Sequence, residues 1–203
     1  MAENLKIDFQ SSAFEKKLKS AHLGSQPLKK AALLRGKPCR LIDGTAGFAE
    51  DSFLLAEWGF EVMSFERNHE VGLQIKNAIA KLGNEDRAFE LLESGKIKFY
   101  FEDFYTFCKR EHLHCEVLYL DPMFPVSNKS ALSEKKVVEL RKLVGEELEP
   151  LEKILKKGLE IATSKVLLKR PLSAPVEFQA QHVFKGSSVR YEVYLKNVAL
   201  KKI

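Results

Sequence analysis

The feature that most limits the possible folds is an alternation of short apolar runs with amphipathic segments from residue 40 onward. The apolar runs are typical of buried strands, at 40–43, 60–65, 96–101, 116–120 and 166–169. Apolar residues at helical spacing predict helices over 48–58, 69–82, 104–111 and about 133–161, after two shorter ones at 11–22 and 26–34. Strands that alternate with helices favour a parallel sheet covered on both faces.

The C-terminal pattern is different. Stretches 178–184 and 189–195 flank Lys185-Gly186-Ser187-Ser188, which is a hairpin signal. The sequence therefore predicts an α/β fold, a mostly parallel doubly wound sheet closed by an antiparallel C-terminal hairpin. We expect two parts, a basic helical N-terminal extension over 1–36 and one α/β domain over 37–203.

Four acidic side chains follow the first four predicted strands. Asp43, Glu66, Asp103 and Asp121 each stand where a strand ends. In doubly wound sheets, ligands bind outside the carboxyl ends of the strands. The sequence thus predicts a ligand site at this edge of the sheet.

A glycine turn between the first strand and the first sheet helix points to a nucleotide ligand. Asp43-Gly44-Thr45-Ala46-Gly47 lets the main chain approach a ligand. Glu66, 23 residues after Asp43, can accept both hydroxyls of a ribose, and Asp103 can hold an adenine amine. These residues fit NAD or S-adenosylmethionine, and the lack of a third glycine favours S-adenosylmethionine.

The segment Asp121-Pro122-Met123-Phe124-Pro125 is typical of a clamp for a flat ring that carries an amino group. The Asp121 carboxylate and the Pro122 carbonyl can both accept hydrogen bonds from one exocyclic amine, and Phe124 can stack on the ring. Such acceptors turn a poor amine nucleophile toward an electrophile. A hydride-transfer enzyme has no need of this clamp, whereas a methyl donor does.

Charge and cysteine content narrow the class of protein. Residues 1–40 hold nine Lys and Arg against three acids, and residues 165–203 hold eight against two. Basic ends around a mildly acidic centre favour a polyanionic partner, and the candidate phosphate contacts are Lys129, Lys169, Arg170, Lys185 and Arg190. Three scattered cysteines predict reduced thiols in a cytoplasmic protein. Without a long apolar run or a ligand-spaced histidine set, we expect neither a membrane nor a metal partner.

Most of the chain, about residues 26–195, is similar to the RsmJ-type methyltransferases, which methylate the N2 amine of a guanine in small-subunit (16S) ribosomal RNA. The resemblance is carried by a series of blocks: Gln26-Pro27-Leu28-Lys29-Lys30-Ala31, Asp43-Gly44-Thr45-Ala46-Gly47, Glu66-Arg67-Asn68, Tyr119-Leu120-Asp121-Pro122-Met123-Phe124-Pro125, Lys129-Ser130-Ala131-Leu132, Leu143-Val144-Gly145, Lys169-Arg170-Pro171 and Lys185-Gly186. It implies a class I (Rossmann-like) methyltransferase domain, with S-adenosylmethionine as donor and the small ribosomal subunit or its RNA as partner. On matching positions it implies a donor site at Glu50, Asp51, Glu66, Arg67, Glu102, Asp103 and Asp121, to which the glycine turn adds Asp43, Gly44 and Gly47.

One departure from the family leaves alternatives open. The family usually has Gly-Arg-Asp where this chain has Ala49-Glu50-Asp51, and Glu50 would repel the carboxylate of the donor. Either Glu50 points away from the donor and a main-chain amide or a lysine takes the place of the arginine, or the donor binds weakly. The alternatives are a methyltransferase on another amine, such as DNA adenine or protein glutamine, and a catalytically idle RNA-binding protein.

Overall fold

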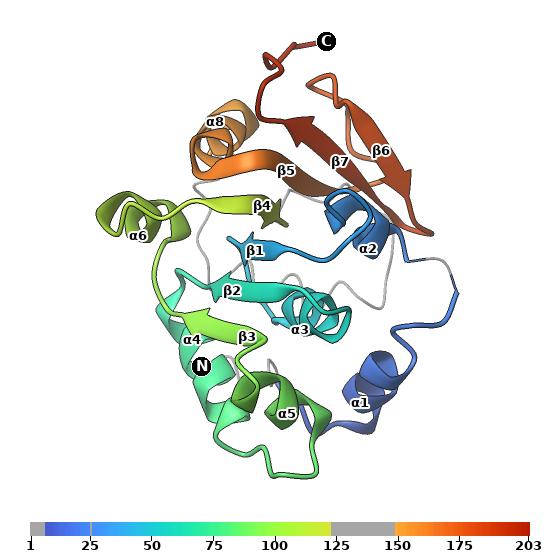
Figure 1. The fold of residues 1–203 in the computed structure, drawn as a ribbon, viewed down its shortest axis with the longest axis vertical. Coiled ribbons are helices and arrows are strands. Elements are labelled where there is room, and N and C mark those ends of the chain that lie inside the picture. Colours follow the sequence, from blue (N-terminus) through green and yellow to red (C-terminus); the bar gives the residue numbers. More distant parts are fainter. Residues whose placement is uncertain (1–6, 25, 123–148) are drawn as a thin grey trace.

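The computed structural model describes residues 7–24, 26–122 and 149–203. Within these ranges, seven strands form one sheet in the order β3-β2-β1-β4-β5-β7-β6 (Figure 1). The strands are β1 (Arg40–Asp43), β2 (Glu61–Phe65), β3 (Ile97–Tyr100), β4 (Cys115–Leu120), β5 (Ala162–Pro171), β6 (His182–Lys185) and β7 (Val189–Leu195). The first five are parallel, and β7 is antiparallel to both β5 and β6. This confirms the predicted fold class.

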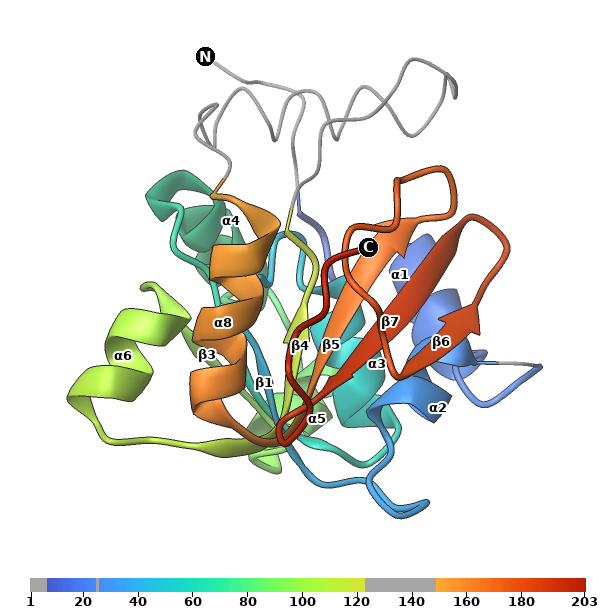
Figure 2. The same cartoon turned by 90° about the horizontal axis from the view of Figure 1, so that it is seen from above.

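Helices cover both faces of the sheet. They are α1 (Ser12–Lys19), α2 (Pro27–Ala32), α3 (Glu50–Glu57), α4 (His69–Ile79), α5 (Arg87–Glu93), α6 (Phe104–Arg110) and α8 (Leu151–Ile161). The first five pack their apolar residues into one core, whereas α6 and α8 pack on the other face of the sheet. Figure 2 shows α6 and α8 on one side of β4 and β5, and α2 and α3 on the other. Alternate side chains of the central strands point into the two cores. On β4, Val117 and Tyr119 face the first core, and Leu118 and Leu120 face the second.

The elements differ from the predicted ones at a few places. Strand β5 begins at Ala162 and continues to Pro171 because it pairs with β7 along that length. Strand β6 begins only at His182, and Phe178 makes an isolated bridge instead. Helix α5 was not predicted, and the part of the predicted long helix up to residue 148 lies outside the described residues.

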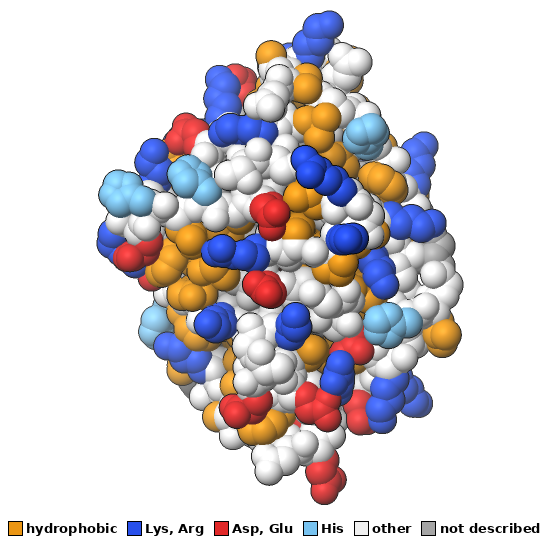
Figure 3. Space-filling view, in the orientation of Figure 1, with side chains coloured by type: hydrophobic (Ala, Val, Ile, Leu, Met, Phe, Trp, Pro, Cys, Tyr) orange, Lys and Arg blue, Asp and Glu red, His pale blue; other side chains and the backbone are white. Residues whose placement is uncertain are grey.

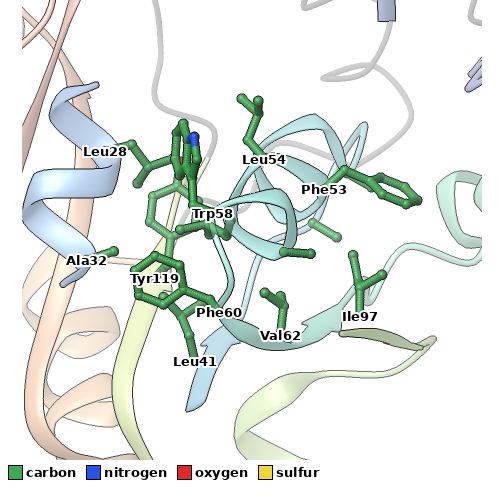
Figure 4. Packing of buried hydrophobic residues seen from close by; sticks show 14 of the residues in the cluster. Leu28, Ala32, Leu41, Phe53, Leu54, Trp58, Phe60, Val62, Ile97 and Tyr119 are labelled. Atoms are coloured by element: carbon green, nitrogen blue, oxygen red, sulfur yellow. The ribbon is translucent and has the colours of Figure 1, made fainter. Parts of the chain in front are cut away.

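The N-terminal segment packs into the same core as the sheet. The indole of Trp58 donates a 2.7 Å hydrogen bond to the carbonyl of Ala21, and Figure 4 shows Trp58 beside Leu28 of α2. The rings of Phe9 and Phe14 contact that of Phe53 on α3, with centroids 4.7 and 5.5 Å away. The domain boundary at residue 36 stays a prediction, and these contacts join its two sides.

The face that Figure 3 presents carries charges of both signs, with histidines and apolar groups between them. It is the side away from the carboxyl ends of the parallel strands, which point to the top of Figure 2. Among the described residues, no helix has the length and apolarity to cross a membrane. The acids that follow the parallel strands lie at the opposite, carboxyl edge of the sheet, so the predicted ligand site belongs there.

Candidate functional site

A pocket opens at the carboxyl edge of the sheet, where the loops after β1, β2, β3 and β4 meet. Its lining includes these residues of the predicted site: Gly44, Gly47, Glu66, Arg67, Asp103, Asp121 and Pro122. Thr45 and Phe104 complete this side, and Glu149, Ile154 and Lys157 close the other. The pocket joins the ends of β1 at Asp43 and β4 at Leu120, which are 77 residues apart in sequence, as the topology predicts.

The glycine turn is held by its own main-chain amides. All four amides of residues 44–47 donate to protein acceptors, which are in order Tyr119 O at 3.0 Å, Asp43 Oδ1 at 3.0 Å, Phe65 O at 2.8 Å and Glu66 Oε2 at 2.8 Å. A side chain at Gly44 would lie 2.9 Å from carbons of Leu120 and Phe104. A dinucleotide needs such amides for its pyrophosphate. The turn thus favours a ligand without phosphate over NAD.

Glu66 lies at the end of β2 with one side toward the pocket. Its Oε1 accepts the amide of Asn68 at 2.7 Å, and its Oε2 accepts that of Gly47. Burial raises the pKa of the Glu66 carboxyl, and these hydrogen bonds with the Arg67 charge oppose the rise. Because a carboxylate has about four acceptor positions, Glu66 retains the capacity to bind ribose hydroxyls.

Asp103 and Glu102 follow β3 but face different ways. Asp103 Oδ1 begins helix α6 by accepting the amide and hydroxyl of Thr106 at 2.9 and 3.0 Å. Its other oxygen makes no hydrogen bond within the described parts of the chain and can accept an adenine amine. Glu102 instead pairs with Arg110 at 2.8 Å, away from the pocket lining.

Asp43 does not line the pocket but lies beneath the glycine turn, 1% exposed. One oxygen accepts the amide of Thr45, and the other accepts the hydroxyl of Ser52. Burial raises the pKa of Asp43 to about 7, and the charges of Asp51 and Asp121 add to the rise. Asp43 therefore holds the glycine turn in place, and its predicted contact with the donor stays a prediction.

Asp121 belongs to a network of charges behind the pocket. Its amide donates to Thr45 Oγ1 at 2.6 Å, and its Oδ2 lies 2.9 Å from the ammonium of Lys169. The same ammonium is 2.7 Å from Asp51 Oδ2, which also accepts the hydroxyl of Tyr119 at 2.6 Å. Lys169, predicted to contact phosphate, is thus bound inside the protein by two carboxylates.

The network shifts each of its ionisable groups. Burial and, to a smaller extent, the charge of Asp51 raise the pKa of Asp121. Together they outweigh the lowering by Lys169, and the net shift of the pKa is upward. Burial also favours neutral Asp51, but Lys169 and Tyr119 outweigh it and leave its pKa low. The pKa of Lys169 is raised well above normal, since the two carboxylates overcome the effect of burial. One cation between two carboxylates leaves a net negative site, which suits a positively charged ligand.

Glu50 points away from the pocket. Its carboxylate is 2.5 Å from the ammonium of Lys17 on α1, and 52% of its side chain is exposed. Its charge is thus paired outside the pocket lining, as the first of the two explanations for Glu50 requires, while the group that would replace the arginine of the family stays a prediction.

Two predicted phosphate contacts are buried. Arg190 pairs with buried Glu192 at 2.7 Å and donates to main-chain carbonyls of residues 171–175. Arg170, 3% exposed, pairs with Glu177 at 3.2 Å. Their expected contact with phosphate is corrected, because both guanidinium groups hold the loop after β5. Lys185 is exposed on β6, while Lys129 and Phe124 lie outside the described residues.

Several members of the site were missed from the sequence. Thr45, Tyr119 and Ser52 anchor the acids. Thr45 and Tyr119 stand in motifs that the sequence singles out, but without a role of their own, and Ser52 stands in none. The three cysteines are free thiols. Among the described residues, no group of three His, Cys, Asp or Glu could hold a metal ion.

Comparison with known proteins decides the family. The family model described as "Putative SAM-dependent methyltransferase" matches residues 1–196. The chain belongs to this family of S-adenosylmethionine-dependent methyltransferases. The solved structure of a SAM-dependent methyltransferase from Neisseria gonorrhoeae agrees, with a TM-score of 0.68 and 25% identity over 97% of this chain and 76% of that one.

Curated relatives of this methyltransferase carry a more specific name. The Ribosomal RNA small subunit methyltransferase J of Pseudomonas fluorescens is 32% identical, over 97% of this chain and 76% of that protein. The protein of the same name from Coxiella burnetii is 33% identical, over 84% of this chain and 66% of that protein. S-Adenosylmethionine is thus the methyl donor, and the free acceptors on Glu66 and Asp103 fit its ribose and adenine.

Proposed function

We propose that this methyltransferase transfers a methyl group to the N2 amine of a guanine in small-subunit ribosomal RNA. The observation that carries the proposal is Asp121-Pro122 at the pocket, on a chain whose relatives are named for methylation of that RNA. Glu66 and Asp103 would hold the ribose and adenine of the donor, and the pocket wall of Gly44 and Gly47 would lie against it.

The chemistry of the step depends on how the amine is held. A nucleobase amine is a weak nucleophile because its lone pair is delocalised into the ring. Asp121 and the Pro122 carbonyl each accept one N–H, which draws the nitrogen toward tetrahedral geometry. When bound, S-adenosylmethionine supplies an electrophilic methyl carbon, to which the lone pair bonds as the carbon–sulfur electrons return to sulfur. The methylated nitrogen then loses one proton, for which Asp121 is a nearby acceptor.

A basic surface beside the pocket supports an RNA substrate. We define it by Lys29 and Lys30 of α2 and Lys185 of the β6–β7 hairpin. Residues 16–42 contain no Asp or Glu, and a side-chain carbon on Gly186 would lie 3.9 Å from Pro27, so α2 and the hairpin are neighbours. Because β7 starts opposite the end of β5, the hairpin lies at the catalytic edge. Phosphate groups are the natural partners of such a surface.

The reading as an idle RNA-binding protein loses its main support, since Glu50 pairs with Lys17 outside the pocket. A methyltransferase on another amine is separated by experiment. Labelled methyl transfer is measured onto undermethylated small ribosomal subunits and onto their naked RNA, followed by nucleoside analysis. Label in N2-methylguanosine is expected. Donor binding without transfer of label to RNA would contradict ribosomal RNA as the substrate, and DNA and protein amines would then be tested.

Two substitutions test the assigned roles. Asp121→Ala is expected to lower turnover by about 10² or more, because the amine loses its acceptor, with little change in donor affinity. Glu66→Ala is expected to weaken donor binding instead, measured by calorimetry. Wild-type turnover by Asp121→Ala would contradict the mechanism.

The basic surface is tested by a double substitution. Lys30→Gln with Lys185→Gln should weaken RNA binding and lower its salt dependence, while Lys98→Gln on β3 serves as the control.

A further inference from the structure

Among the described residues, Lys169 is the cation that lies nearest to Asp121, the proposed acceptor of the amine. Its ammonium contacts Asp51 at 2.7 Å and Asp121 at 2.9 Å. We propose that Lys169 is a positioning residue for methyl transfer, which holds Asp121 charged and in one orientation toward the amine. The inference rests on the proposed function, in which Asp121 accepts the amine.

The contacts of Asp121 leave one oxygen for the substrate. Its amide is fixed by Thr45 Oγ1, and its Oδ2 is taken by Lys169. Within the described parts of the chain, Oδ1 has no hydrogen-bond partner, and Asp121 lines the pocket. The lysine thus selects which oxygen meets the amine, as an acceptor must be held in place for catalysis.

Lys169 is itself fixed from a second element. Asp51 stands in the first turn of α3 and binds both the lysine and the hydroxyl of Tyr119. The ammonium therefore cannot follow Asp121 if that carboxylate turns, since the contact with Asp51 would be lost. The side chains of Lys169 and Asp51 are 22% and 20% exposed, so water screens this pair weakly. The side chain of Asp121, which lines the pocket, is 39% exposed.

The charges around Asp121 explain why a cation is required. Burial disfavours a negative charge on Asp121, and so does the charge of Asp51 from α3. Asp43, the last residue of β1, is coupled to Asp121 in the same sense once it is ionised. Tyr119 of β4 and Tyr191 of β7 face the same cluster, and their pKa values are raised. Lys17 of α1 adds a positive charge near Asp51. Among the described residues, Lys169 is the cation in direct contact with Asp121, and its loss would raise the pKa of this carboxyl further.

A protonated Asp121 would be a poor acceptor for the amine. An opposite charge at this distance lowers the pKa of an aspartate by about 1 to 3 units. Removal of the lysine should therefore move the acid limb of the pH–rate profile upward by about one unit or more. A purely structural lysine would not have this effect.

The chain supplies a matched control on the same strand. Lys165, four residues before Lys169 on β5, is also buried, and its ammonium donates at 2.6 Å to the carbonyls of Ala31 and Leu33. It contacts none of the acids in the network. Lys165→Met removes a buried ammonium from β5 without removing the partner of Asp121.

Three properties are measured for wild type, Lys169→Met, Lys169→Arg and Lys165→Met. They are kcat over pH 5.5–9 (about two units around neutrality), the affinity for the donor, and the melting temperature. Lys169→Met should lose about 10²-fold in kcat at pH 7 and recover partly at higher pH, whereas Lys169→Arg keeps the wild-type acid limb. Lys165→Met should lower the melting temperature and leave the pH profile unchanged.

Three results would overturn the inference. One is an unchanged acid limb in active Lys169→Met. Another is a large loss of donor affinity in that variant, which would make the lysine a ligand of the donor carboxylate. The third is an equal shift in Lys165→Met. If wild type itself methylates no ribosomal RNA, the proposed function fails, and that result is distinct from all three.

Discussion

Asp43 offers the sharpest link between the structure and a measurable free energy. Its carboxyl is 1% exposed beneath the glycine turn, and burial raises its pKa from 3.8 to about 7. Between these values the unfolded chain is ionised at this position, while the folded protein retains the proton. The free energy of unfolding therefore falls as the pH rises from about 4 to 7, and the whole loss persists above pH 7.

The size of this loss follows from the shift. One pKa unit corresponds to about 1.4 kcal/mol, so ionised Asp43 costs the folded protein about 4 kcal/mol at pH 8. Asp43→Asn removes the charge and can keep the contacts, because the amide oxygen can accept from Thr45 and its NH2 can donate to Ser52. We expect the variant to be more stable than wild type by about 2 to 4 kcal/mol at pH 8, or roughly 5 to 10 °C in melting temperature.

The assay is urea unfolding of the donor-free protein at pH 4.5, 6, 7 and 8 (about the window set by the two pKa values). The gain from Asp43→Asn should be small at the lowest pH and grow with pH. Asp103→Asn is the control, since asparagine begins a helix as well as aspartate does. An equal gain at every pH would show that packing, not charge, is the cause, and no gain at pH 8 would refute the reasoning.

Two further substitutions test the fold at particular positions. Gly44→Ala would place a carbon 2.9 Å from side-chain carbons of Leu120 and Phe104. We expect the free energy of unfolding, measured in urea, to fall by about 1 to 3 kcal/mol and donor binding, measured by calorimetry, to weaken. Wild-type values of both would contradict the tight packing of this turn. His112, just after helix α6, has a left-handed main-chain conformation (φ 50°), which glycine adopts without strain. His112→Gly should therefore stabilise the protein by about 0.5 to 1 kcal/mol in urea unfolding. A destabilised variant would show that the contacts of the His112 side chain outweigh its strain.

The sequence predicted best where local pattern and topology agree. Apolar runs identified the parallel strands, and the rule that ligands bind at strand carboxyl ends brought Glu66, Asp103 and Asp121 to one pocket. Helix α5 was missed because it has only seven residues and two buried ones, Ala88 and Leu91. Such a short apolar pattern carries little periodic signal.

The partners of charged residues could not be predicted from the sequence. Lys169 and Arg170 are adjacent in the chain, but strand alternation sends them to opposite faces of the sheet. The lysine meets Asp51, which is 118 residues away, and the arginine meets Glu177 in the loop that follows β5. Both had been expected to contact phosphate because basic residues gather near the predicted strand ends. Only the assembled sheet shows which acids they face.

Trp58 is the one tryptophan in the sequence, and its place gives the protein a built-in optical probe. The indole is 5% exposed, donates to Ala21 and lies 6.0 Å from the ammonium of Lys29. Release of the N-terminal segment would bring water to this ring and shift its fluorescence to longer wavelength. Attachment of α1 and α2 can thus be followed by emission in the unlabelled protein, separately from unfolding of the sheet recorded by circular dichroism.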